Sequence, residues 1–148
     1  LPDDYKLVII GEGEERNLIE NCIIQYGLSS RVFLIGKRDD VNKFYSACDL
    51  FIISSLWEGF GLVVAEAMSC QRIVIGTDAG GIREVIGNDH FIVPTSQPTL
   101  LAEKIMEISM LDQRTCEDIE YKNRAFISKQ FGIDSIVQEW LRVYKFNN

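Results

Sequence analysis

Residues 49–68 decide the fold of this chain, and they read DLFIISSLWEGFGLVVAEAM. The apolar run at 49–53 is typical of a strand, the glycines after it indicate a loop, and the apolar run from residue 61 predicts a helix. The same order of strand, short loop and helix recurs along most of the chain. Such repetition predicts parallel strands that are joined by helical crossovers.

The predicted strands are five short runs rich in β-branched residues, at 6–10, 31–35, 49–53, 72–75 and 91–93. Several are continuously apolar, which indicates a sheet covered on both faces. The segments between them are predicted to be helices, at 14–26, 41–47, 62–69 and 82–86. We therefore expect the α/β class, with a Rossmann-like, doubly wound parallel sheet and flanking helices.

The pattern changes after residue 94, where three helical segments follow one another without a strand, at 99–111, 112–130 and 133–146. In the last segment apolar residues recur with helical spacing, so one face must pack on a partner. Two partners remain open, namely the sheet of this domain, which we favour, and a neighbouring domain.

Composition excludes several classes of protein. The 148 residues carry a formal net charge of −7 and 47% hydrophobic residues, which fits one globular domain and argues against a nucleic-acid platform. No apolar run approaches the length of a membrane-spanning helix, and the first residues do not resemble a signal peptide. Because the chain starts at Leu1 and leads directly into a strand, we expect a piece of a longer protein.

Cysteine and histidine usage narrows the chemistry further. The four cysteines are far apart and suggest neither a disulfide framework nor a zinc site, which favours a cytoplasmic protein: Cys22, Cys48, Cys70 and Cys116. His90 is the only histidine, so mechanisms that need a pair of histidines or a Ser-His-Asp triad are excluded within this chain.

The loop before the helix at 62–69 has the features of an anion site. Gly59 and Gly61 allow a ligand to approach the backbone, and the first helical turn after Gly61 presents free N–H groups. Glu58 precedes the helix, and Glu66 lies about one turn inside it, where burial without hydrogen-bond donors would be costly. Sugar or ribose hydroxyls would supply donors, so we expect a ligand with both phosphate and hydroxyl groups.

Two further turns follow strands. The glycine-rich turn at 76–81 opens the next helix and is expected to line the same crevice. Gly36, Lys37 and Arg38 lie at the end of another strand. Two interpretations of these cationic side chains remain open: they are solvated surface charges, or they contact a base or a phosphate. The Gly-Glu-Gly turn at 11–13 is best interpreted as a tight turn before a helix, because neighbouring carboxylates would repel a pyrophosphate.

In order and spacing, these segments resemble glycosyltransferase family 4, the "glycosyl transferases group 1" domain. The matching motifs are LVIIGEG at 7–13, VFLIG at 32–36, ACDLF at 47–51 followed by two serines, an E-x7-E pair, GG--E at 80–84 and IVP at 92–94. In this family the domain is the donor-binding C-terminal half of retaining glycosyltransferases with the GT-B fold. The resemblance therefore implies a nucleotide-sugar donor domain over 1–148.

The resemblance also implies roles for single residues. Glu58 would be the catalytic residue that holds the transferred sugar, and Glu66 would bond the ribose hydroxyls. The remaining donor contacts would come from Gly59, Phe60, Gly61, Leu62 and Val63 at the diphosphate or sugar, and from Gly36, Lys37 and Arg38 at the base. The donor would be a UDP-, GDP- or ADP-sugar, and no metal ion or obligatory cofactor is implied.

The implied enzyme is a hexosyltransferase that acts on a saccharide or lipid-linked acceptor, as in polysaccharide or lipopolysaccharide biosynthesis, with peripheral membrane association open. In the family an N-terminal acceptor domain, a first strand and a diphosphate clamp of Arg and Lys precede residue 1, so we expect a monomeric, inactive fragment. Gln71, Arg72 and Ile73 occupy a stretch where the family usually has Gly and Pro, which predicts a small shift in strand packing. His90 stands where a Gly is common, which predicts a strained or different turn. The alternatives are a non-catalytic nucleotide-binding module, or an epimerase or phosphorylase on the same fold.

Overall fold

The computed structural model describes residues 1–146 and contains two compact units. Unit 1 comprises Leu1–Val41, and unit 2 begins at Asn42. The five strands occur where the sequence predicts them and pair in parallel, but they form two sheets, β1-β2 and β3-β4-β5. The α/β class with parallel strands and flanking helices is thereby confirmed.

Unit 1 holds a small sheet in which β1 (Leu7–Ile9) lies parallel to β2 (Val32–Leu34), and α1 (Arg16–Gln25) connects the two strands. The structure describes all of residues 1–41, and none of them is buried. Val8, in the middle of β1, is 46% exposed. The prediction that apolar strands are covered on both faces is therefore wrong for β1, because unit 1 offers too little chain to form two covering layers.

Unit 2 contains the core of the molecule around β4 (Ile73–Thr77), whose five residues are all buried. β4 lies between β3 (Leu50–Ile53) and β5 (Ile92–Val93), with Leu50 opposite Ile73 and Gly76 opposite Ile92. α2 (Val41–Ala47) precedes β3, α3 (Leu62–Ser69) connects β3 to β4, and α4 (Ile82–Ile86) and the 3₁₀ turn η1 (Asp89–Phe91) connect β4 to β5. The apolar sides of α3 and α4 are buried, as crossover helices on a parallel sheet require.

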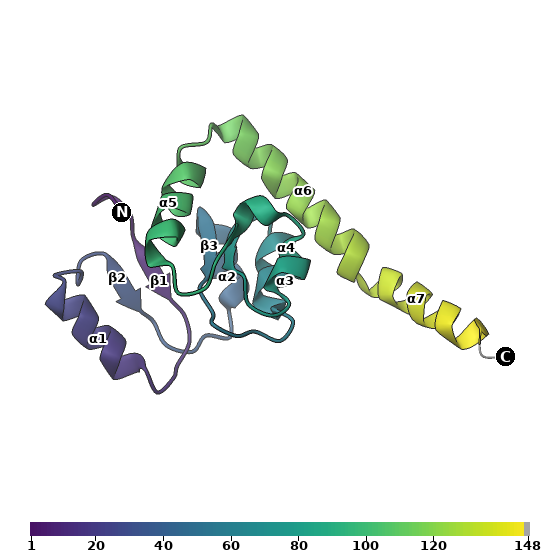
Figure 1. Ribbon diagram of the computed structural model, residues 1–148, viewed down its shortest axis with the longest axis horizontal. Coiled ribbons are helices and arrows are strands. Elements are labelled where there is room, and N and C mark those ends of the chain that lie inside the picture. The colour runs from purple at the N-terminus through teal and green to yellow at the C-terminus, as the bar shows by residue number, and fades with distance from the viewer. Residues whose placement is uncertain (147–148) are drawn as a thin grey trace. The chain divides into compact units, whose positions relative to one another are not determined.

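The last part of unit 2 is helical, with α5 (Pro98–Ser109), α6 (Gln113–Phe131) and α7 (Ile133–Phe146). α6 packs on α3 and on β4, whereas α7 contacts α6 and extends away from the sheet (Figure 1). Trp140 and Tyr144 on α7 are 58% and 63% exposed. Packing of α7 on the sheet of its own domain is therefore wrong. Docking on a neighbouring domain stays a prediction.

The two turns that depart from the family pattern behave differently from one another. Gln71 has a φ of +59°, and its N–H donates to the carbonyl of Met68 at 3.0 Å, so the left-handed turn that ends α3 is kept without a glycine. His90 has no positive φ and lies in a 3₁₀ turn, where its Nε2 is 3.1 Å from Glu107 Oε1. No helix within residues 1–146 is long and apolar enough to span a bilayer.

Candidate donor-binding site

The start of α3 forms the centre of the candidate site. Gly61 adopts a φ of +86°, a left-handed conformation that glycine tolerates best, and thereby turns the chain into the helix. The N–H groups of Val64 and Ala65 return to the carbonyl of Gly61. Leu62 and Val63 precede the first residue that makes such a bond, and both are exposed. Their N–H groups and the helix dipole can therefore receive an anion.

Glu58 is half-buried in the loop before α3, and its Oε1 accepts a hydrogen bond from the N–H of Gly59 at 3.1 Å. A second loop fixes the backbone at this point, because the N–H of Gly81 donates to the carbonyl of Gly59 at 3.0 Å. Gly80 has a φ of +53°, and a Cβ there would lie 1.7 Å from the carbonyl oxygen of Glu58. The second glycine pair thus permits a close approach of two loops.

Thr77 binds the loop that carries Glu58 at a second point, close to the end of β3. It is a buried polar residue at the end of β4, and its hydroxyl donates to the carbonyl of Ser55 at 2.6 Å. Such a bond satisfies both groups inside the protein, where an unpaired carbonyl or hydroxyl would be costly. The loop that carries Glu58 is therefore held at Ser55 by the last residue of β4 and at Gly59 by the turn that follows β4.

Glu66 lies on the exposed side of α3, which contradicts the expectation that its carboxylate is at risk of unpaired burial. Its Oε2 accepts a hydrogen bond from the hydroxyl of Tyr45 at 3.0 Å. Tyr45 was not among the residues selected from the sequence, because it lies 21 positions earlier, on α2. Nothing in the local pattern around residue 45 signals this contact.

Gly36, Lys37 and Arg38 belong to unit 1, whereas residues 58–66 belong to unit 2. Gly36 has a φ of +72°, and its carbonyl accepts from the N–H of Gly11 at 2.9 Å. The Arg38 guanidinium donates to both carboxylate oxygens of Asp40, at 2.9 and 3.0 Å, and this carboxylate raises the pKa of Arg38. Lys37 is exposed. A role of these residues at a base stays a prediction.

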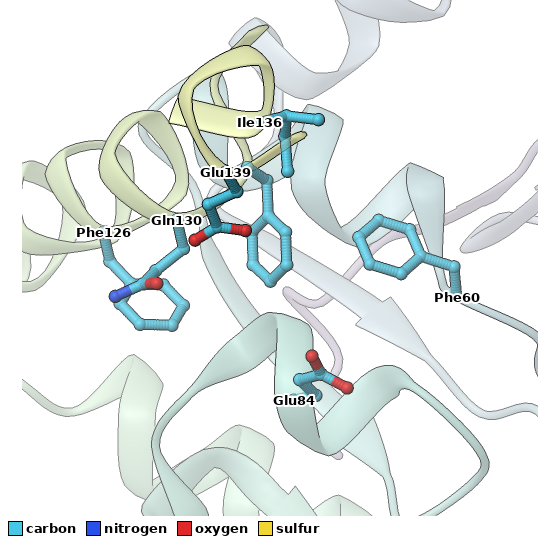
Figure 2. A pocket seen from close by; sticks show the side chains of 7 residues that line it. Phe60, Glu84, Phe126, Gln130, Ile136 and Glu139 are labelled. Atoms are coloured by element: carbon cyan, nitrogen blue, oxygen red, sulfur yellow. The ribbon is translucent and has the colours of Figure 1, made fainter. Parts of the chain in front are cut away.

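A cleft of about 570 Å³ opens beside Phe60, and three aromatic rings and two carboxylates line it (Figure 2). The rings of Phe60 and Phe131 meet edge to face, with centroids 5.2 Å apart. Glu84 of α4 and Glu139 of α7 contribute the carboxylates. Within residues 1–146 no group of three or more His, Cys, Asp or Glu side chains is placed to hold a metal ion.

The family model described as "Glycosyl transferases group 1" matches residues 1–126. The chain belongs to this family. Its similarity therefore covers both units and everything from β1 to the middle of α6. The α/β domain is accordingly one half of a GT-B glycosyltransferase fold.

Three relatives illustrate the range of the family. N-acetyl-alpha-D-glucosaminyl L-malate synthase of Bacillus anthracis is 31% identical over 143 residues, which cover 95% of this chain and 37% of the relative. N,N'-diacetylbacillosaminyl-diphospho-undecaprenol alpha-1,3-N-acetylgalactosaminyltransferase of Campylobacter jejuni is 29% identical, over 97% of this chain and 38% of the relative. The crystal structure of Anabaena Alr3699/HepE in complex with UDP is 27% identical with a TM-score of 0.86, over 97% of this chain and 42% of that one. The chain thus spans about two fifths of the length of these relatives.

Proposed function

We propose that this chain is the donor-binding domain of a glycosyltransferase that takes a sugar from a nucleotide diphosphate-sugar and retains its anomeric configuration. The observation that carries the proposal is the start of α3, where the first helical residues are exposed and stand in the chain between two glutamates, Glu58 and Glu66. Family membership and the likeness to a protein crystallised with UDP support it.

Each part of this arrangement suits one part of a nucleotide sugar. The N–H groups of Leu62 and Val63 meet the diphosphate, whose negative charge grows as the bond to the sugar breaks. N–H groups that already point toward this charge need no rearrangement during the reaction. Glu58 accepts hydrogen bonds from hydroxyls of the transferred sugar, and Glu66 accepts them from the ribose.

The proposal extends to the whole protein. An acceptor domain outside this chain holds a saccharide or a lipid-linked saccharide, as the name of the Campylobacter relative suggests for that enzyme. The donor is a UDP-, GDP- or ADP-sugar, and the chain by itself is a monomeric, inactive part. The four cysteines are free thiols, which supports a reducing cytoplasmic location, with contact to the inner face of the membrane in the full protein.

Calorimetric titration of the full protein with UDP, GDP, ADP and their sugar conjugates tests the proposal. We expect saturable binding of one nucleotide, and the Glu66→Ala variant should bind it about tenfold to a hundredfold more weakly, because a charge-assisted hydrogen bond is lost. Glu103→Ala removes another exposed carboxylate, on α5, and serves as the matched control.

Two results would contradict the proposal. Absence of binding for all the nucleotides would favour a module without a donor site. Equal affinity in Glu66→Ala and in the unmodified protein would remove Glu66 from the site, even if a nucleotide binds elsewhere.

A further inference from the structure

Tyr45 on α2 donates a hydrogen bond to the carboxylate of Glu66 on α3. The side chain is 4% exposed, and its hydroxyl lies 3.0 Å from Glu66 Oε2. The ring meets Phe51 of β3 edge to face, with centroids 5.4 Å apart and planes at 80°. The buried ring of Tyr45 is thus held against β3, and its hydroxyl is bonded to Glu66.

The direction of this hydrogen bond follows from the chemistry of the two groups. Burial, together with the hydrogen bond to Glu66, raises the pKa of Tyr45 well above its ordinary value. The hydroxyl therefore keeps its proton at physiological pH and donates, while the carboxylate accepts. Within the described residues no hydrogen bond occupies Oε1 of Glu66, so the second oxygen is free to accept from a ligand.

An exposed glutamate without a fixed partner would sample several rotamers, and a ligand would have to immobilise it on binding. The Tyr45 hydroxyl already restrains one carboxylate oxygen of Glu66, so less conformational entropy is lost when a ligand binds. We propose that Tyr45 is a positioning residue, which orients the carboxylate of Glu66 toward the ribose of the donor. This inference rests on the proposed function, since it assumes that Glu66 meets the ribose.

The test compares nucleotides that differ only in the ribose hydroxyls. Titration of the full protein with UDP, GDP and ADP identifies the nucleotide that binds, and its 2′,3′-dideoxy counterpart is then titrated in parallel. Tyr45→Phe keeps the ring and its contact with Phe51 but removes the hydroxyl. We expect about a fivefold loss of affinity for the ribonucleotide and little change for the dideoxynucleotide, because one hydrogen bond is lost at the ribose contact only.

A matched control and a second variant separate positioning from structure. Tyr121→Phe removes a hydroxyl from an exposed tyrosine on α6 and should change neither affinity. In Glu66→Ala, which lacks the carboxylate, the further change Tyr45→Phe should have no additional effect on ribonucleotide affinity. A general loss of structure would instead weaken both nucleotides equally and would lower the melting temperature in proportion.

The outcomes distinguish this inference from the proposed function. If Glu66→Ala weakens binding and Tyr45→Phe does not, only the role of Tyr45 is overturned. Equal losses for the ribonucleotide and its dideoxy counterpart in Tyr45→Phe would also overturn it. If Tyr45→Phe does not fold, Glu66→Gln decides: with Tyr45 positioning its side chain, this variant should retain more ribonucleotide affinity than Glu66→Ala, and equal affinity would overturn the inference.

Discussion

The strands β1 and β4 have similar sequences and opposite surroundings. Val8 at the centre of β1 is 46% exposed, whereas Val74 in β4 is 1% exposed. Both strands are short, apolar and paired in parallel with a neighbour. An apolar run therefore indicates a strand but does not measure its burial, which depends on the layers that the rest of the chain provides.

The two units differ in the same way, because the buried core and the two candidate glutamates both lie in unit 2. The buried apolar side chains, from Tyr45 to Ile127, all belong to unit 2, so the hydrophobic contribution to stability is concentrated there. The same unit carries Glu58, beside which the backbone of Gly59 bonds to Gly81, and Glu66, whose side chain bonds to the buried Tyr45. Substitutions that are matched between the two units test this contrast.

The largest difference is expected for two glycines with positive φ. Gly80→Ala places a Cβ against the carbonyl oxygen of Glu58 and should lower the free energy of unfolding by about 3 kcal/mol, because a backbone must move. In Gly27→Ala the added Cβ has no neighbour within 4 Å. Only the left-handed backbone conformation, with a φ of +64°, then lowers the free energy of unfolding, by about 1 kcal/mol. Urea unfolding of both variants measures the difference.

The Gly80 variant should also lose nucleotide affinity, since the displaced loop carries Glu58. Gly27→Ala should bind as the unmodified protein does. A Gly80→Ala variant with unchanged stability and affinity would show that the two loops are not in close contact in solution.

A smaller difference is expected for the two valines. Val74→Ala leaves a cavity in the core and should cost about 2 kcal/mol, whereas Val8→Ala removes atoms that already contact solvent and should cost about 0.5 kcal/mol or less. Thermal and urea unfolding of the two variants give the comparison. Equal losses would mean that β1 is covered in the intact protein, and the contrast between the units would then disappear.

The smallest effect concerns thiol chemistry. Burial raises the pKa of Cys48 in unit 2, so its thiol stays protonated at pH 8, whereas Cys22 on α1 is exposed. Labelling with iodoacetamide, followed by peptide mapping, should modify Cys22 first and Cys48 at least about tenfold more slowly. Similar rates for the two thiols would contradict the burial of Cys48.

The raised pKa of Cys48 also makes the stability of the protein depend on pH. The pKa of Cys48 is higher in the folded chain than in the unfolded one, so its contribution to stability is complete below the ordinary thiol pKa of about 8.5. The contribution is lost as pH rises through the raised value, because the unfolded chain releases its proton first. Unfolding at pH 7 and pH 10 should show this loss, which Cys48→Ala should reduce.

Local signals in the sequence were sufficient to place most elements. The helix predicted at 62–69 has those bounds in the structure, because a glycine precedes it and its apolar spacing is helical. The same holds for 82–86, where a glycine stands on each side. The helix predicted at 14–26 is shorter, Arg16–Gln25, since the glutamates before it remain outside the helix.

Properties that depend on distant parts of the chain could not be predicted in this way. The bond between Tyr45 and Glu66 joins two helices, and neither local pattern contains it. The helical spacing of α7 indicated an apolar face correctly but could not identify its partner. The close contact of the glycines at 80 and 81 with the loop that carries Glu58 likewise joins distant parts of the chain, and their place in a ligand crevice stays a prediction.

The attachment of the Glu58 loop to the end of β4 and to the turn after it has a consequence for engineering. Thr77 and Gly81 hold this loop at Ser55 and Gly59. Both bonds end on backbone carbonyl oxygens, so a loop of the same length that is imported at residues 54–60 from a relative can accept them whatever its side chains are. In such a chimera Thr77, Gly80 and Gly81 must stay as they are, because they supply the hydroxyl, the N–H group and the space on which the attachment depends.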